Sequence, residues 1–130
     1  MNGEHQIMAT ETVYAVKQQG RVLGNPAYRY VRPSDGLPAV GATEDTPDPV
    51  VRVKLFDPCG AWTWYLTECN LETGEAFGLV DGFEVELGYI DLAELAAVRG
   101  KLGLPIERDI HWKPQPLSAV RNAIERRREP

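Results

Sequence analysis

Three polar residues near the C-terminal end have types and a spacing that could support chemistry. Glu107, Asp109 and His111 occupy alternate positions of the segment IERDIHW. If this segment is a strand, the three side chains point to the same face. They could then hold a divalent metal for a hydrolytic reaction, or Asp109 could orient His111 as a general base. Alternating polar residues are equally typical of a strand that simply faces solvent.

Acidic residues dominate the middle of the chain. Between Leu55 and Val98 there are nine Asp and Glu residues and no Lys or Arg, although the whole chain has 14 Lys and Arg. On the outer side of a sheet, these acids would create a negative potential that attracts a basic partner. A solvated surface without any partner would carry the same residues. The acids that we expect to form such an acidic face are Glu68, Asp81, Glu84, Glu86, Asp91 and Glu94.

A basic cluster lies at the C-terminus, where the sequence reads ERRRE. Its arginines, residues 126–128, could contact DNA together with Arg121, Arg29 and Arg32 if folding brings them to one face. The formal net charge of −5 argues against general affinity for nucleic acid. Binding to DNA therefore ranks below binding to a basic protein surface.

The sequence lacks the motifs of the common enzyme and cofactor classes. Cys59 and Cys69 form neither a CxxC pair nor half of a zinc site, and no phosphate-binding loop or dinucleotide fingerprint is present. His5 is the only histidine besides His111. We therefore expect no cofactor and favour a non-enzymatic role, with a metal-assisted hydrolase as the alternative.

The composition is that of an ordinary globular protein. The chain has 130 residues, of which 43% are hydrophobic and 25% charged, and this length fits a single domain. No apolar run is long enough to span a bilayer, and the N-terminus lacks the features of a secretory signal. These observations predict a cytoplasmic protein without a membrane partner, and they say nothing about its oligomeric state.

The elements that must position these residues are predicted to form an antiparallel meander. Residues 50–56 alternate in polarity as a half-buried strand does, residues 62–69 and 75–80 form a hairpin, and residues 83–90 follow the tight turn Asp81-Gly82. In the last of these strands, we expect Val85, Leu87 and Tyr89 to face the core.

Two helices complete the prediction. Asp91 is a good N-cap for a helix over residues 92–99, with Glu94 completing a capping box and Gly100 providing a left-handed exit. Residues 106–112 form a last strand, and Ser118 caps a closing helix that ends at about Arg128. The expected fold class is α+β, with an antiparallel meander sheet of about four to six strands packed with two helices.

The chain divides into three parts on composition. Residues 1–33 form an N-terminal arm with short strands at 11–17 and 28–32, and residues 34–49 form a connector rich in Pro and Gly. Residues 50–128 form the single α+β core domain. The arm must pack on the main sheet or on a partner, because two short strands are marginal alone.

Several blocks, in this order and spacing, resemble the bacterial family called domain of unknown function 2958. The blocks are VRVKLFDP, WTWYLTE, FGLVDGFEVELGYIDLAELAAVRGKLGLPIERDIHW and KPQPL, and the similarity runs from about Leu37 to Leu117. The resemblance implies a small bacterial protein of the kind found near plasmid and phage genes. It implies no catalytic residues.

The sequence thus favours a small interaction protein, an accessory factor of a mobile element whose acidic face engages a basic macromolecular surface. The hydrolase and the DNA-binding protein remain as alternatives.

Overall fold

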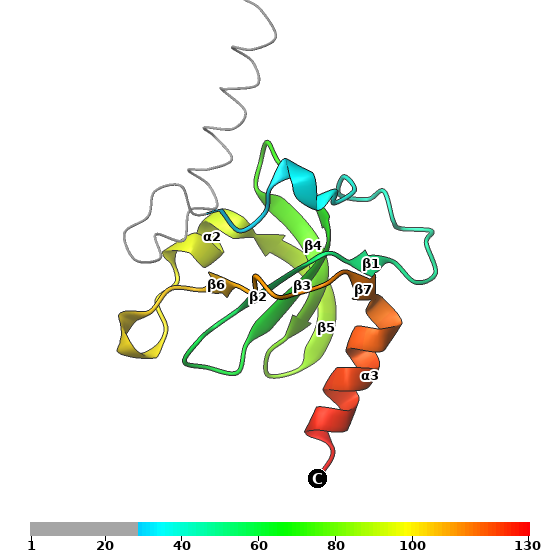
Figure 1. Ribbon diagram of the computed structural model, residues 1–130. Coiled ribbons are helices and arrows are strands. Elements are labelled where there is room, and N and C mark those ends of the chain that lie inside the picture. The colour runs from blue at the N-terminus through cyan, green and yellow to red at the C-terminus, as the bar shows by residue number, and fades with distance from the viewer. Residues whose placement is uncertain (1–28) are drawn as a thin grey trace, which may run out of the picture.

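The computed structural model describes residues 29–130 of the protein. A five-stranded antiparallel sheet with the strand order β5-β4-β3-β2-β6 forms its centre, and β1 and β7 pair separately beside it (Figure 1). The strands are β1 (Val50–Val51), β2 (Val53–Phe56), β3 (Thr63–Cys69), β4 (Glu75–Asp81), β5 (Val85–Asp91), β6 (Glu107–Arg108) and β7 (Gln115–Pro116). The predicted α+β class is confirmed, because β2 to β5 form an antiparallel meander in chain order.

The helices within residues 29–130 are short. They are the 3-10 turns η2 (Pro33–Asp35) and η3 (Lys101–Gly103) and the α-helices α2 (Leu92–Ala97) and α3 (Leu117–Arg128). Within the described part of the chain, no helix is both long and apolar enough to cross a membrane.

The two α-helices cover opposite faces of the sheet. On one face, Val53, Leu55 and Leu66 pack with Leu92 and Leu95 of α2. On the other face, α3 covers the sheet with a stripe spaced three and four residues apart, as an amphipathic helix requires. The core on this second face consists of Val51, Tyr65, Leu79, Leu117, Val120 and Ile124.

A β-bulge in β3 changes which side chains face each core. The register with β4 shifts between Leu66 and Glu68, so Glu68 lies opposite Phe77 and Cys69 lies opposite Ala76. Because an extra residue reverses the alternation, Glu68 leaves the face of Leu66 and joins the face covered by α3. Simple alternation along the sequence would place Glu68 on the same face as Leu66.

Residues before Val50 contribute to the core. Tyr30 and Val31 are fully buried in the α2-side core, and the Tyr30 hydroxyl donates to the Ile106 carbonyl at 2.8 Å. The predicted strand at residues 11–17 lies outside the described residues. The prediction of a strand at residues 28–32 is wrong for its described part, because residues 29–32 form no strand.

Three predicted elements have different bounds in the structure. The predicted strand 50–56 divides at Arg52, and its two parts pair with different strands. The predicted strand 106–112 is reduced to β6, because the chain turns at Asp109, whose carboxylate accepts the His111 amide at 2.9 Å. The helix that starts after Asp91 ends at Ala97 instead of residue 99, since Val98 has extended backbone.

The predicted N-cap of α2 agrees with the structure, whereas the predicted left-handed exit at Gly100 and the predicted cap of α3 do not. The Asp91 side chain accepts the amides of Ala93 and Glu94. Ser118, predicted as the cap of the closing helix, lies inside α3. Its amide and hydroxyl donate to the carboxylate of Asp48 in the connector, at 2.9 and 2.6 Å.

The predicted core face of β5 is wrong. Leu87 is 44% exposed and Tyr89 is 71% exposed, whereas Ile90 on the opposite face is buried. The reason is that α3 covers the sheet near Leu79 and only reaches the Val85 end of β5. An apolar strip of the sheet is therefore left open.

Candidate functional site: the free edge of β5

Strand β5 forms one edge of the five-stranded sheet, and within residues 29–130 it pairs only with β4. The Leu92 amide donates to the Gly74 carbonyl at 2.9 Å, and the Gly82 amide donates to the Glu84 carbonyl at 3.0 Å. Since directly hydrogen-bonded pairs alternate along an antiparallel ladder, the even-numbered residues of β5 bond to β4. The amides and carbonyls of Val85, Leu87 and Tyr89 therefore point away from the sheet.

An apolar strip is formed by the side chains of Val85, Leu87 and Tyr89, the residues whose backbone groups point away from the sheet. Tyr89 packs edge-on against Phe77 of β4, with ring centroids 5.1 Å apart. Leu87 lies opposite Leu79, and Val85 packs against the core under α3. The edge thus offers backbone groups and apolar side chains together.

A groove of about 470 Å³ adjoins this strip. Phe77, Leu87 and Tyr89 line it on the sheet, the connector supplies one wall, and α3 supplies Leu117 and Arg121. Arg121 also lines a second hollow of about 520 Å³, which Val85 and Ile124 share. The two hollows therefore follow one another between α3 and β5.

Glu68 holds the connector wall of the groove in place. Its side chain is buried in β3, and its carboxylate accepts the amides of Gly41 at 2.7 Å and Thr43 at 2.8 Å, as well as the Thr43 hydroxyl. Burial alone would raise the pKa of Glu68, but the hydrogen bonds from Thr43 and Gly41 outweigh it and hold that pKa below its ordinary value. The carboxylate is therefore charged at neutral pH and serves as an internal anchor.

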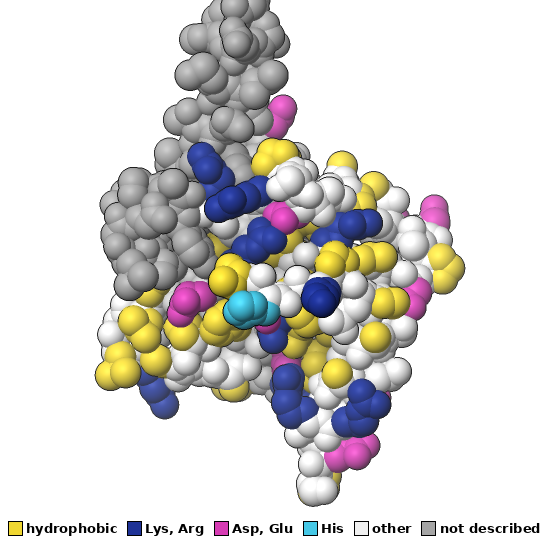
Figure 2. All heavy atoms as spheres, in the orientation of Figure 1, with side chains coloured by type: hydrophobic (Ala, Val, Ile, Leu, Met, Phe, Trp, Pro, Cys, Tyr) yellow, Lys and Arg dark blue, Asp and Glu magenta, His cyan; other side chains and the backbone are white. Residues whose placement is uncertain are grey.

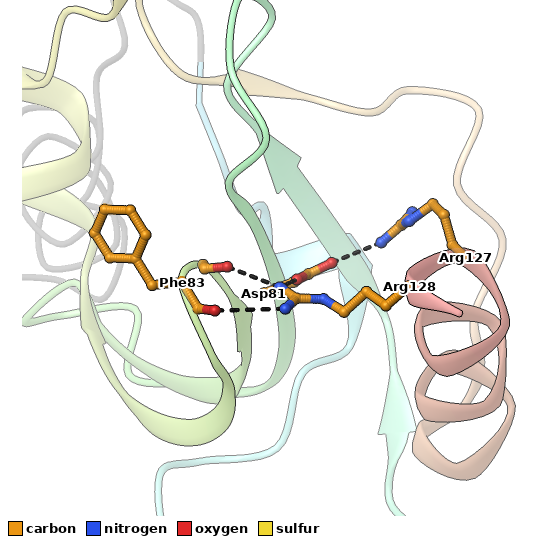
Figure 3. A network of polar contacts seen from close by, with 5 residues as sticks. Asp81, Phe83, Arg127 and Arg128 are labelled. Atoms are coloured by element: carbon orange, nitrogen blue, oxygen red, sulfur yellow. Dashed lines mark hydrogen bonds and ion pairs between the residues drawn. The ribbon is translucent and has the colours of Figure 1, made fainter. Parts of the chain in front are cut away.

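Asp81 anchors the C-terminal end of α3 to the turn between β4 and β5. Its side chain is only 4% exposed, and it receives the guanidinium groups of Arg127, at 2.6 Å, and Arg128 (Figure 3). Arg128 also donates to the carbonyls of Gly82 at 2.7 Å and Phe83 at 3.4 Å. The basic C-terminal cluster thus supplies the positive partners that the acidic stretch lacks in its own sequence.

The six acids expected on one face are divided by the fold. Glu68 and Asp81 are buried and serve as internal anchors, as described above. Asp91 is exposed but caps α2. Glu84 and Glu86 are exposed at the start of β5, and Glu94 lines a hollow of about 440 Å³ near its end. The exposed acids therefore flank the apolar strip instead of covering a broad sheet surface.

Charge is distributed unevenly across the molecule. The strand order places β5 at one edge of the sheet and β2 and β6, with Lys54 and Arg108, toward the other. Figure 2 shows Lys and Arg side chains gathered across the middle of the face that carries β1, β2, β6 and β7. Arg108 is paired there with Asp35 at 2.7 Å. The exposed acids Glu84, Glu86 and Asp91 lie at the other edge of the sheet, in or next to β5.

The three residues proposed for metal or acid-base chemistry do not converge. Asp109 pairs with Lys54 at 3.6 Å and accepts the backbone amide of His111, whose side chain is exposed. Among residues 29–130, no group of three His, Cys, Asp or Glu side chains is arranged to hold a metal ion. Glu107, Asp109 and His111 lie on a strand end and a turn, so they share no single strand face.

The arginines that the DNA-binding alternative requires also make different contacts in the structure. Arg127 and Arg128 are bound to Asp81, and Arg121 lines the groove beside β5. The two arginines at the end of α3 are therefore committed to an internal acid.

The exposure of Leu87 and Tyr89 and the position of Arg121 were missed at the level of sequence. A usable signal was that only one closing helix follows the predicted meander, because a single helix is about 10–12 Å wide. Five strands spaced about 4.8 Å apart span about 19 Å, which is more than the width of one helix. Part of the face under α3 was therefore bound to remain open.

Comparisons with known proteins place the chain in a family. No curated protein and no solved structure matches it. One family model, described as Protein of unknown function (DUF2958), matches residues 36–128 and so covers the meander, both α-helices and the walls of the groove. The chain therefore belongs to the DUF2958 family.

Proposed function

We propose that this protein is a small non-enzymatic interaction protein that adds an extended, basic segment of another protein to the free side of β5. The observation that carries this proposal is that the outward-pointing backbone groups of β5 lie beside the solvent-exposed apolar side chains of Leu87 and Tyr89. Addition of a strand to an exposed sheet edge is a recurrent mode of peptide recognition, in which backbone hydrogen bonds supply affinity.

Within residues 29–130, the edge of β5 pairs with no further strand and carries neither of two common protections against strand addition, Lys and Pro. Natural edge strands are commonly kept short or carry Lys or Pro, which prevent pairing with another chain. The seven residues of β5 include neither Lys nor Pro, and two of its large apolar side chains are exposed. An edge of this length with exposed apolar side chains supports a role in binding.

The charges around β5 indicate the chemistry of the partner. Glu84 and Glu86 are exposed at one end, and Asp91 and Glu94 at the other, with no Lys or Arg in the intervening sequence. A segment with Lys or Arg opposite Glu84 and Glu86 would be attracted and steered to this edge. A second copy of the chain would bring the same acids together, so we favour a basic partner over self-association.

The expected partner segment alternates in character. Positions that face Val85, Leu87 and Tyr89 across the new ladder place their side chains on the apolar side, and the positions between them face Glu84 and Glu86. A synthetic peptide that alternates Lys and Val and matches β5 in length therefore serves as a probe. A peptide of the same length that alternates Glu and Val is the matched control.

Fluorescence anisotropy of the labelled peptides tests the proposal. We expect the Lys peptide to bind, to weaken as salt rises, and to lose affinity for the variant Glu84→Lys with Glu86→Lys, while the Glu peptide does not bind. Unchanged binding at high salt or to the double variant would overturn the acidic recognition. Sedimentation that shows dimers of the protein alone, abolished by Leu87→Pro, would overturn it in favour of self-association.

The variant Leu87→Pro tests the edge itself. Because the Leu87 amide points to solvent, proline at this position removes no hydrogen bond to β4, and proline is tolerated at such edge positions. We expect this variant to keep its thermal stability to within a few degrees and to lose the Lys peptide. Retained affinity would show that the backbone of β5 is not the binding element.

A further inference from the structure

Resting on the proposed function, we infer that the bound segment inserts one aromatic side chain into the groove lined by Phe77, Tyr89 and Arg121. The groove opens directly beside Leu87 and Tyr89, which also form part of its lining. A strand added outside β5 would place every second side chain on this side of the sheet. One of these side chains would therefore stand at the mouth of the groove.

The size and the lining of the groove favour a large apolar side chain. Its volume of about 470 Å³ lies in the range of pockets that bind ligands. On the sheet and helix side the lining consists of the apolar groups of Phe77, Leu87 and Leu117, whereas its polar residues are Thr43, Glu44, Thr46, Thr67, Glu68 and Arg121. The Thr67 hydroxyl, one of the polar groups, already donates to the Phe77 carbonyl at 3.2 Å.

Two features favour an aromatic ring over an aliphatic chain. Tyr89 is 71% exposed and uses one side of its ring on Phe77, so its remaining surface is open to a second ring. Aromatic rings prefer edge-to-face or offset contacts at separations of about 4.5–7 Å, which the existing pair already shows. The third aromatic ring would extend this pair along the groove.

Arg121 supplies the opposite wall. Among residues 29–130, the Arg121 side chain forms no hydrogen bond or ion pair, although it lines both hollows between α3 and β5. A planar guanidinium stacks well on an aromatic face. The groove therefore offers a ring on one side and a guanidinium on the other, which suits an aromatic residue flanked by basic residues in an extended segment.

The test compares the Lys and Val peptide with a second peptide in which one central Val is replaced by Phe. We expect the Phe peptide to bind about tenfold more tightly, because it adds buried area and aromatic contacts. In the variant Tyr89→Ala, which removes a ring from the strip that both peptides contact, the gain should vanish and the two peptides should bind with equal affinity. Ile110→Ala, which changes a 78% exposed apolar residue outside the groove, is the matched control and should retain the gain.

The outcomes separate this inference from the proposed function. If neither peptide binds, the proposed function fails and the inference fails with it. If the Lys and Val peptide binds at the β5 edge but Phe gives no gain, or if Tyr89→Ala leaves the gain intact, the groove is not an aromatic site and only the inference fails. Loss of the gain in Arg121→Gln, with circular dichroism unchanged, would support the stacking wall.

Discussion

The contact of Asp81 with Arg127 and Arg128 predicts that one substitution has opposite effects in two backgrounds. Asp81 is 4% exposed at its side chain, whereas Arg127 and Arg128 are 59% and 42% exposed. Removing the cations from a fully buried pair costs about 3–5 kcal/mol, and exposed pairs contribute about 0.2–1 kcal/mol. Because only the acid is buried here, we expect Arg127→Ala with Arg128→Ala to lower the free energy of unfolding by about 2 kcal/mol.

The effect of Asp81→Asn on the free energy of unfolding should then have opposite signs in the two backgrounds. In the wild-type protein it weakens two charged contacts and should cost about 1 kcal/mol. In the double-arginine variant it removes a buried charge that has lost its partners, so it should raise stability. Urea unfolding followed by circular dichroism measures all four proteins, with Arg126→Ala as an exposed control. An equal effect of Asp81→Asn in both backgrounds would refute the coupling.

Three further predictions concern single residues of the sheet. Glu68→Gln should lower the free energy of unfolding by about 1–2 kcal/mol at pH 7. Because the folded pKa of Glu68 is lowered, the stability difference between the two proteins should be full above the ordinary pKa of 4.5 and vanish as pH falls through the folded pKa; a constant difference in urea unfolding from pH 7 to pH 3 would contradict this. Gly78→Ala should destabilise by about 3 kcal/mol, since its Cβ would lie 1.9 Å from a carbonyl oxygen of β3, whereas Gly88→Ala meets nothing within 4 Å and should change Tm little; equal Tm values would contradict the packing. Burial raises the pKa of the Cys69 thiol to about 12, so a thiol reagent at pH 8 should modify the half-buried Cys59 first and Cys69 only on unfolding. Equal labelling rates of the two cysteines, measured by mass spectrometry, would contradict this.

Much of the meander could be predicted because its signals are local. Polarity alternates within each strand, Asp81-Gly82 marks the turn into β5, and the Asp91 cap marks the start of α2. The bulge between Leu66 and Glu68 could not be predicted in the same way, since its location depends on the partner strand. Alternation also indicates which residues share a face but not how far a helix covers that face. Leu87 and Tyr89 were assigned to the core for this reason.

The candidate site depends mostly on contacts between distant parts of the chain. The acid-rich stretch indicated that positive partners had to come from elsewhere, and Arg127 and Arg128 supply them to Asp81 across 46 and 47 residues of sequence. The pairing of Asp48 with Ser118 spans 70 residues. Such contacts have no local periodicity, so only the folded chain shows that Glu68 and Asp81 are anchors.

Amide hydrogen exchange along β5 tests the central proposal most directly. In the free protein, the outward amides of Val85, Leu87 and Tyr89 should exchange quickly, and the inward amides of Glu86 and Gly88 should exchange slowly. Addition of the Lys and Val peptide should slow the three outward amides and leave the inward ones nearly unchanged. Binding of that peptide with no added protection at Val85, Leu87 and Tyr89 would contradict strand addition at this edge.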